Sequence, residues 1–453
     1  MSDSTAEPRR RATDPTVLTL AATTAVGAAL LCRILLLDGE SSDYFYFLGP
    51  WYRYIAENGG FAALSDMEFS DYNAPYLYLM AALTYLPVPA LAGIKWVSIL
   101  FDLALASYTF RIVALRRPRR LRPALGAAVV VLLLPTVVIN SGWWGQADAI
   151  FTTFLVGGLY HLLRDRPWWA GAFFGIALAF KLQAVFLLPL LLVLVLVKRI
   201  PWPSLLAVPA VYLALDVPAL LLGADPWKLL TVYTRQTGTY TQLTLNAPSV
   251  YQFVSVPQTA EGAVRSVGVL IAGATVLVLI GLAVRSVRRA GGAVERDGRP
   301  LLTRTTVLLL ATTSAIAVPF LLPSMHERYF YVADVLCVVV AFHRPRRLWH
   351  LPILVQASSL GSYLTFIAPA VAPYLSMPAH GMLMLLALLA VLRATARELR
   401  GVPAPEAVRR ATSWGTRSPC SSPSSPPCWC SSPSSPARSP SPELLPRHGR
   451  TGD

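Results

Sequence analysis

The chain has 453 residues, of which 55% are hydrophobic and only 14% are charged. A soluble protein of this length carries far more charge, so the composition excludes a soluble domain. It predicts an all-α, polytopic membrane protein whose helices each need about 20 apolar residues. The net charge of +15 lies in short basic clusters between apolar runs. Such clusters are typical of cytoplasmic loops and do not indicate nucleic-acid binding.

The N-terminal region sets the expected orientation. Residues 1–15 are polar, and Arg9, Arg10 and Arg11 directly precede the first apolar run at 16–37. This charge predicts a cytoplasmic N-terminal segment, so the acidic segment 38–73 is expected outside. The next apolar run, 75–88, is short and rich in tyrosine. We expect it to form a juxtamembrane or re-entrant helix at the outer interface.

The apolar runs predict about twelve spans and a cytoplasmic C-terminus. After the first run, they are expected at 91–115, 124–140, 147–163, 168–181, 183–197, 204–223, 265–284, 303–322, 329–343, 349–368 and 376–395. The transmembrane domain is therefore expected over 16–396. The tail, 397–453, becomes a Ser/Pro/Cys tract from Ser413 onward, which predicts disorder. A frameshift explains this tract as well as a functional tail does.

Asp43 is the first candidate for chemistry. It follows the first span and is flanked by Tyr44, Tyr46, Trp51 and Tyr52. A carboxylate among aromatic rings can act as a general base toward a sugar hydroxyl, with the rings stacked on the sugar. An interfacial loop with an aromatic belt has the same composition, so position alone does not decide between the two.

Two further outer segments carry polar groups. Asp71 or Asn73 is expected to cap the helix that starts near Pro75. The turn at 140–148 contains two tryptophans with Gln146 and Asp148. A carboxylate at a helix N-terminus is favourable in itself, although this set also suits polyol binding. The five cysteines show neither a disulfide framework nor a zinc spacing, and no metal site is expected.

Cations follow at two other places. His326, Glu327 and Arg328 lie between two late spans, where Arg328 can bind phosphate oxygens in a fork. The alternative is an Arg328–Glu327 pair that extends to the interface. Lys181 is a second phosphate partner or another interfacial cation at a hairpin tip. The charges inside spans, Arg33, Asp102, Asp216 and Asp334, are expected to form structural pairs.

Five tracts occur in one order: 43–52, 71–76, 144–148, 181–183 and 326–329. This order resembles the GT-C superfamily of polyprenyl-phosphate-sugar-dependent glycosyltransferases. It is most similar to the group that includes the second mannosyltransferase of GPI-anchor assembly and its bacterial relatives. The resemblance implies a cell-membrane enzyme without a cofactor. It would transfer a sugar, expected to be mannose, with inversion from a polyprenyl-phosphate donor to an extracytoplasmic glycan or glycolipid acceptor.

The resemblance also implies roles for individual residues. Asp43 would be the catalytic base. The donor-phosphate residues would be His326, Glu327, Arg328, Lys181 and Gln183, and the sugar or acceptor residues Tyr44, Trp51, Tyr52, Asp71, Trp144, Gln146 and Asp148. Ala74-Pro75 and Ala147 depart from the pattern of the relatives. The alternative is a flippase for a lipid-linked precursor, which would need a charged central cavity between two related halves.

Overall fold

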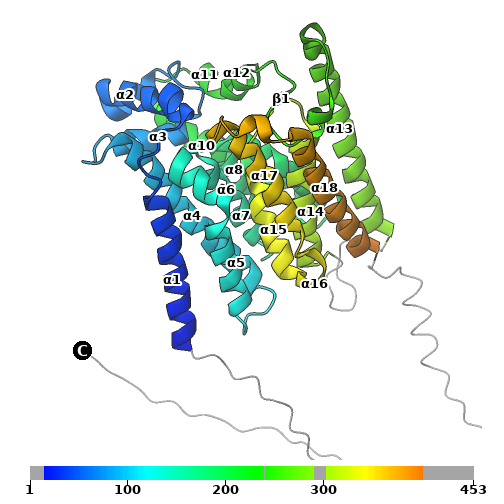
Figure 1. Ribbon diagram of the computed structural model, residues 1–453. Helices are drawn as coiled ribbons and strands as arrows, with labels where there is room; N and C mark the ends of the chain where they lie inside the picture. Colours follow the sequence, from blue (N-terminus) through cyan, green and yellow to red (C-terminus); the bar gives the residue numbers. More distant parts are fainter. Residues whose placement is uncertain (1–14, 239, 290–301, 401–453) are drawn as a thin grey trace, which may run out of the picture. The chain divides into compact units, whose positions relative to one another are not determined.

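The computed structural model describes residues 15–238, 240–289 and 302–400 (Figure 1). Apart from one two-stranded pair, the regular structure in these ranges is helical, as expected. The arginine cluster at 9–11 and nearly all of the predicted tail lie outside the described residues.

The helices agree with the apolar runs of the sequence, often to within a few residues. The first half contains α1 (Pro15–Ile34), η1 (Tyr44–Leu48), α2 (Gly49–Glu57), η2 (Gly60–Ser65), α3 (Ala74–Leu83), α4 (Ala90–Ala114), α5 (Arg122–Leu133), α6 (Pro135–Val138), η3 (Ile139–Trp144), α7 (Asp148–Leu162), α8 (Pro167–Phe180), η4 (Leu182–Leu187), α9 (Leu188–Leu196), η5 (Trp202–Leu206) and α10 (Ala207–Leu221). The expected helix near 75–88 is present as α3.

The second half begins with the loop elements α11 (Pro226–Leu230), α12 (Val232–Gly238), β1 (Thr244–Leu245) and η6 (Val250–Phe253). It continues with α13 (Gln258–Arg289), α14 (Arg304–Leu321), β2 (Met325–His326), α15 (Tyr331–His343), α16 (Pro345–Leu348), α17 (Leu351–Ile367), η7 (Ala372–Tyr374) and α18 (Met377–Arg400).

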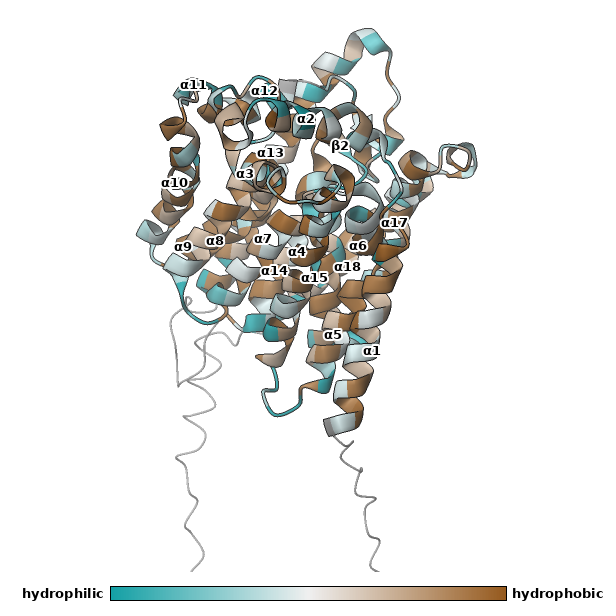
Figure 2. Cartoon of the chain, turned by 90° about the vertical axis from the view of Figure 1, so that its left-hand side faces the viewer, coloured by the Kyte–Doolittle hydropathy of each residue, from teal (hydrophilic) through white to brown (hydrophobic). Residues whose placement is uncertain are grey.

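Six of the described helices are long and apolar enough to cross a membrane, and seven are if the bent stretch from α5 to η3 is one span. The other apolar helices have 10–17 residues, so length and composition do not show all twelve expected spans. The fold is therefore that of a polytopic helical membrane protein. Figure 2 shows hydrophobic residues along the middle of the bundle and hydrophilic ones at its two ends.

A proline bends the span expected at 124–140. Leu134 has an extended ψ of 127° immediately before Pro135, as the proline ring requires of its neighbour. The two helical halves meet at 53°. The second half continues as the π-helix η3, so part of the segment expected to be an outer turn is helical. The bend brings Trp144 and Gln146 within hydrogen-bonding distance of Asp43, which lies just before α2 in the sequence.

Buried polar pairs fix the helices against one another. Arg33 Nε lies 2.8 Å from Asp102 Oδ2, with both side chains almost fully buried. This confirms the structural pairing expected for these two charges. Asp216 and Asp334 instead accept hydrogen bonds from the neutral side chains of Asn73 and Ser359. Neither has a cation partner in the described residues, so the structural partner of each of these two charges is a neutral side chain.

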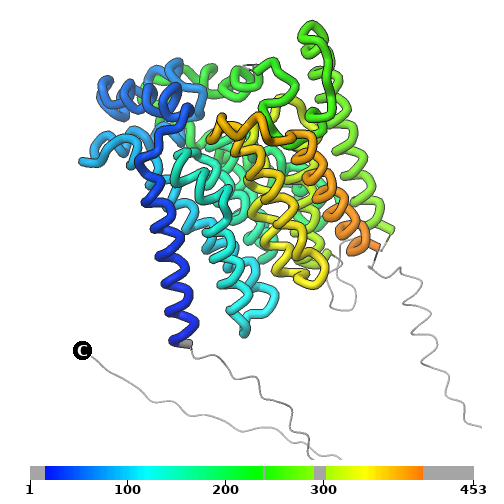
Figure 3. Tube along the Cα trace, viewed as in Figure 1, coloured from blue at the N-terminus to red at the C-terminus, as the bar shows by residue number. Residues whose placement is uncertain are grey.

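The loops that follow α1, α10 and α14 gather at one end of the bundle. In the tube of Figure 3, the blue segment after α1 and the green segment before α13 lie at the same upper end. The parallel pairing of β1 with β2 joins the second of these loops to the third. Three segments that are far apart in sequence are thereby brought together over the ends of the central helices.

Candidate active site

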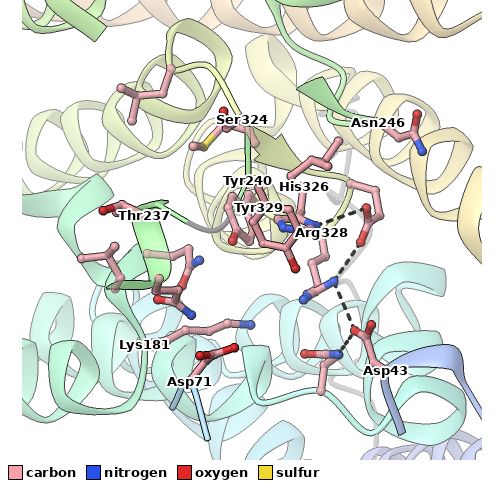
Figure 4. A pocket seen from close by; sticks show the side chains of 18 of the residues that line it. Asp43, Asp71, Lys181, Thr237, Tyr240, Asn246, Ser324, His326, Arg328 and Tyr329 are labelled. Carbon is pink, nitrogen blue, oxygen red and sulfur yellow. Dashed lines mark hydrogen bonds and ion pairs between the residues drawn. The ribbon is translucent and has the colours of Figure 1, made fainter. Parts of the chain in front are cut away.

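A cavity of about 760 Å³ lies among these three loops and the ends of α7, α8 and α13. Its lining contains nine of the residues singled out from the sequence: Asp43, Trp51, Asp71, Gln146, Lys181, Gln183, His326, Glu327 and Arg328. Figure 4 shows the charged groups of this set facing a common space. Trp144 and Asp148 lie behind the wall, in contact with lining residues. Tyr44 and Tyr52 do not line the cavity, and the Tyr52 hydroxyl donates to the carbonyl of Leu83 at 3.5 Å.

One oxygen of Asp43 carries all the polar contacts of its carboxylate. Trp144 Nε1 donates to Asp43 Oδ2 at 3.0 Å, and Gln146 Nε2 donates to the same atom. Arg328 Nη1 lies 3.4 Å from it. Both hydrogen-bond donors belong to the tract that the Pro135 bend brings to the cavity. The carboxylate is thus fixed from one side, and its other oxygen, Oδ1, makes no hydrogen bond with the described residues.

Arg328 lies at the centre of three carboxylates. Besides Asp43, its guanidinium lies 2.9 Å from Glu327 Oε1 and 3.7 Å from Asp148 Oδ2. Its Cζ lies 5.4 Å from the centroid of the Trp144 ring, within the range of a cation–π contact. Burial alone would lower the pKa of Arg328, but Asp43, Glu327 and Asp148 raise it well above its usual value. Figure 4 shows the side chain directed inward, so the interfacial alternative does not describe it.

Glu327 and His326 form the outer part of this charge network. His326 Nδ1 lies 3.8 Å from Glu327 Oε2. Burial raises the pKa of Glu327, but the neighbouring His326 ring and the charge of Arg328 outweigh burial and hold it below its usual value. The His326 ring packs edge-on against Tyr240, with centroids 4.7 Å apart. The carboxylate form of Glu327 is therefore favoured by its neighbours His326 and Arg328.

Lys181 and Asp148 form a buried pair beneath the cavity. Lys181 Nζ lies 2.5 Å from Asp148 Oδ1, and their side chains are only 3% and 2% exposed. Asn140 donates to the second oxygen of Asp148 at 2.9 Å. Lys181 breaks the helix between α8 and η4, as the hairpin interpretation predicted. Because it is buried, Lys181 is not an interfacial cation, and its charge is matched by a carboxylate.

The capping role expected of Asp71 or Asn73 is wrong. Asn73 occupies the N-cap position of α3, but its side chain makes no cap hydrogen bond. It donates instead to Asp216 and to the carbonyl of Ala179, at 3.0 and 3.3 Å. The side chain bonds to these long-range partners and not to the helix terminus, because the partners are buried and would otherwise lack a donor. Asp71 lines the cavity.

Several lining residues were given no role from the sequence: Tyr240, Gln236, Arg265 and Tyr329, the last of which lies in the 326–329 tract. Tyr240 and Tyr329 pack on either side of His326. Arg265 lies in the second turn of α13 and donates to the carbonyl of Thr237. An arginine at the start of a long apolar run was the available signal. In the described residues, no group of three or more His, Cys, Asp or Glu side chains is arranged to hold a metal ion.

The family model of glycosyltransferase family 87 matches residues 69–319, more than half of the chain. The chain therefore carries a membrane glycosyltransferase domain of the GT-C type over these residues. The chain is a member of glycosyltransferase family 87. No curated protein matches the chain. The match includes Asp148 and Lys181, whereas Asp43 and Arg328 lie outside its bounds.

The membership supports the superfamily resemblance and the enzyme class. It favours the enzyme over the flippase alternative, because the family is one of glycosyltransferases. The family match does not specify the donor, the sugar or the acceptor. It also does not specify the closer likeness to the GPI mannosyltransferase group.

Proposed function

We propose that this protein transfers a mannosyl group from a polyprenyl-phosphate donor to a glycan or glycolipid hydroxyl, with inversion at the anomeric carbon. The observation that carries the proposal is the set of contacts made by the Asp43 carboxylate. Three side chains fix one oxygen of its carboxylate, while the other is left for a proton inside a cavity large enough for a sugar. The choice of mannose and of a polyprenyl phosphate rests on the resemblance of the ordered tracts.

The proposed chemistry is one displacement. An acceptor hydroxyl gives its proton to Asp43 Oδ1 as its oxygen forms a bond to the anomeric carbon. The bond from that carbon to the phosphate oxygen breaks, and polyprenyl phosphate leaves with the electron pair. Trp51 and Tyr72, whose ring centroids are 5.2 Å apart, offer an aromatic wall for the sugar. Charge on the departing phosphate needs cations placed before the reaction starts.

Inversion places the phosphate on the opposite side of the sugar from the base. Arg328, His326 and Lys181 remain proposed phosphate partners, but Arg328 and Lys181 already pair with carboxylates. We add Arg265, whose described side-chain contact is only with a main-chain carbonyl. That carbonyl belongs to Thr237, which lies across the cavity from Asp43 in Figure 4. Arg265 is thus a cation of the lining that is not neutralised by a carboxylate in the described residues.

We further propose that the cavity faces the extracytoplasmic side and that the apolar helices make twelve crossings. The support is the distribution of charge. The loops at the cavity end include the acidic segment 38–73, while arginine clusters such as 116–122 and 344–347 lie beyond the opposite ends of the helices. A polyprenyl-phosphate donor would then reach the site from the outer leaflet.

The test is a transfer assay with the purified full chain and polyprenyl-phosphate mannose, glucose or arabinose, with a synthetic glycolipid acceptor library. We expect transfer from the mannose donor and formation of the inverted anomer. Transfer only from another sugar would overturn mannose as the donor sugar. Activity with a nucleotide sugar and none with any polyprenyl-phosphate sugar would overturn the donor class.

The role of Arg265 has its own test, which does not depend on the sugar. Binding of polyprenyl phosphate to Arg265→Gln, to wild type and to Arg288→Gln is compared, with uncharged polyprenol as the second probe. We expect Arg265→Gln to weaken phosphate binding about 10-fold or more, as for a hydrogen bond to a charged group. The binding of uncharged polyprenol to Arg265→Gln should stay near the wild-type value. The binding of polyprenyl phosphate to Arg288→Gln should also stay near the wild-type value. Equal phosphate binding in all three proteins would exclude Arg265.

A further inference from the structure

A second concave site lies at the opposite end of the bundle from the active-site cavity. A cleft of about 820 Å³ is lined by arginines from two loops: Arg116, Arg117, Arg120, Arg122, Arg344, Arg346 and Arg347. Arg116, Arg117 and Arg120 lie between α4 and α5, and Arg122 is the first residue of α5. The others lie at α16 and just before it. More than 200 residues of sequence separate the two groups, so the fold itself brings these like charges together.

Packing and one long-range hydrogen bond build the cleft. α15 packs against both α4 and α5. Arg116 Nη1 donates to the carbonyl of Phe342 at 3.0 Å, which ties the two loops together. Arg344 Nη2 donates to both carboxylate oxygens of Glu398, at 2.7 and 2.8 Å. The positions of the two loops are thus fixed relative to each other before any ligand is considered.

The other five arginines of the cleft have no side-chain partner within the described ranges, and Glu398 is the one carboxylate paired with any of the seven. The cost is visible at Arg116, whose pKa is lowered by burial and by the neighbouring charges of Arg117 and Arg344. A protein does not gain stability by gathering unpaired guanidinium groups. An anion bound between the loops would relieve this repulsion.

The apolar residues that line the cleft indicate which class of anion it binds. Val113 and Phe342 line the cleft together with the arginines, and α4, a candidate span, ends at Ala114. The cleft is therefore at the depth where a bilayer's hydrocarbon gives way to its headgroups. Guanidinium forks match phosphate oxygens, and apolar side chains beside them suit the first carbons of acyl chains. We propose that this cleft binds the headgroup of an anionic phospholipid.

Charges that only orient the chain during insertion give a weaker explanation. Arg285 in α13 and Arg397 in α18, near the same end of the bundle, do not line this cleft. Charges that only orient the chain need to lie only beside the cytoplasmic ends of the spans. They do not need to converge from two distant loops on one cleft with apolar lining residues. The proposal thus concerns the shape of the cluster and does not depend on the transfer reaction.

Lipid binding to the purified full chain tests the proposal. Phosphatidylglycerol is titrated into phosphatidylcholine nanodiscs, and bound lipid is counted by native mass spectrometry. The cleft variant is Arg120→Gln with Arg347→Gln, two exposed side chains without described partners. The control, Arg285→Gln with Arg397→Gln, removes the same charge elsewhere at that end. Each cleft arginine is expected to contribute about fivefold to affinity, so the cleft variant should bind about 25-fold more weakly.

The control variant should bind within about twofold of wild type, because its arginines lie outside the cleft. Equal weakening in both variants would show a diffuse charge effect and overturn the site. A further arm measures competition by inorganic phosphate and by phosphatidylcholine. Little competition by either is expected. Displacement of phosphatidylglycerol by millimolar inorganic phosphate would overturn the assignment to a lipid and indicate a free-phosphate site.

Discussion

At the scale of single residues, the contacts of the site fix the position of one carboxylate. Asp43 has two neutral donors and one cation on a single oxygen. Arg328 in turn is shared with Glu327 and Asp148, so the cation cannot leave without exposing buried negative charge. Such a network holds the Asp43 carboxylate in place. Because Arg328 is already paired, the proposed binding of a donor phosphate requires further cations besides Arg328.

Trp144→Phe tests the positioning of Asp43. The variant removes the indole N–H donor while keeping an aromatic ring against Phe366, whose centroid lies 4.6 Å from that of Trp144. We expect kcat to fall about 10- to 100-fold, since a hydrogen bond to a charged group contributes about 1.5–3 kcal/mol. The KM for the donor should change less than twofold. Trp143→Phe, next in the chain but without a hydrogen bond to Asp43 in the described contacts, is the matched control, and equal loss in both variants would contradict this role.

The pKa of Glu327 makes a prediction about pH and stability. An unfolded Glu titrates near pH 4.3, and the pKa of Glu327 in the folded protein is lower. Its contribution to stability is therefore complete above the unfolded value and is lost as pH falls through the folded one. Glu327→Gln should destabilise the protein by about 1–3 kcal/mol at pH 7. Thermal unfolding in detergent should show this difference shrinking below about pH 4, and a pH-independent difference would contradict it.

At the scale of elements, the turn between η3 and α7 connects the helical bend to the site. Gly145 ends η3 with a φ of +72°, in the left-handed region that glycine tolerates. A Cβ there would lie 3.3 Å from Lys95 Cγ. Lys95 cannot move freely, because its amine donates to the carbonyls of Leu36 and Leu37 at 3.0 and 2.8 Å. The residues on either side of Gly145 are the two neutral donors to Asp43.

Gly145→Ala should therefore harm both stability and transfer. A left-handed conformation costs a non-glycine residue about 1–2 kcal/mol. Transfer should fall further than stability explains, because Trp144 and Gln146 shift together. Gly273→Ala in α13 is the control, since nothing lies within 4 Å of its added Cβ and alanine favours a helix. Thermal unfolding and kcat are measured on both, and unchanged kcat in Gly145→Ala would refute the link between this turn and Asp43.

The sequence predicted the helices better than it predicted the bends and pairings that connect them. The run at 91–115 became α4 (Ala90–Ala114), because a continuous apolar run defines a helix by its own composition. The Pro135 bend, the extension of η3 and the β1–β2 pairing were not predicted. Each depends on how distant segments pack. Asp43 was identified from its position, but its donors Trp144 and Gln146 lie 101 and 103 residues further along the chain. Arg265 was missed because it reads as the first residue of a span.

At the scale of the whole molecule, the account requires the two ends of the bundle to face different compartments. Cysteines introduced at Ser65 and Arg119, both exposed, test this directly in a background where Cys32, Cys420, Cys428 and Cys430 are replaced. Ser65→Cys should react with an impermeant maleimide in intact cells, and Arg119→Cys only after permeabilisation. The opposite labelling would reverse the topology and place the active-site cavity in the cytoplasm.

The catalytic role of Asp43 is the central claim, and single-turnover transfer by Asp43→Asn tests it most directly. The amide keeps the shape of the carboxylate but cannot take a proton, so transfer should fall about 10²- to 10⁴-fold. Donor binding and thermal stability should remain near wild type. Asp66→Asn, an exposed aspartate of the same loop that accepts from Tyr54, is the control and should transfer normally. Near-normal turnover in Asp43→Asn, with or without loss of activity in Asp71→Asn, would contradict the account.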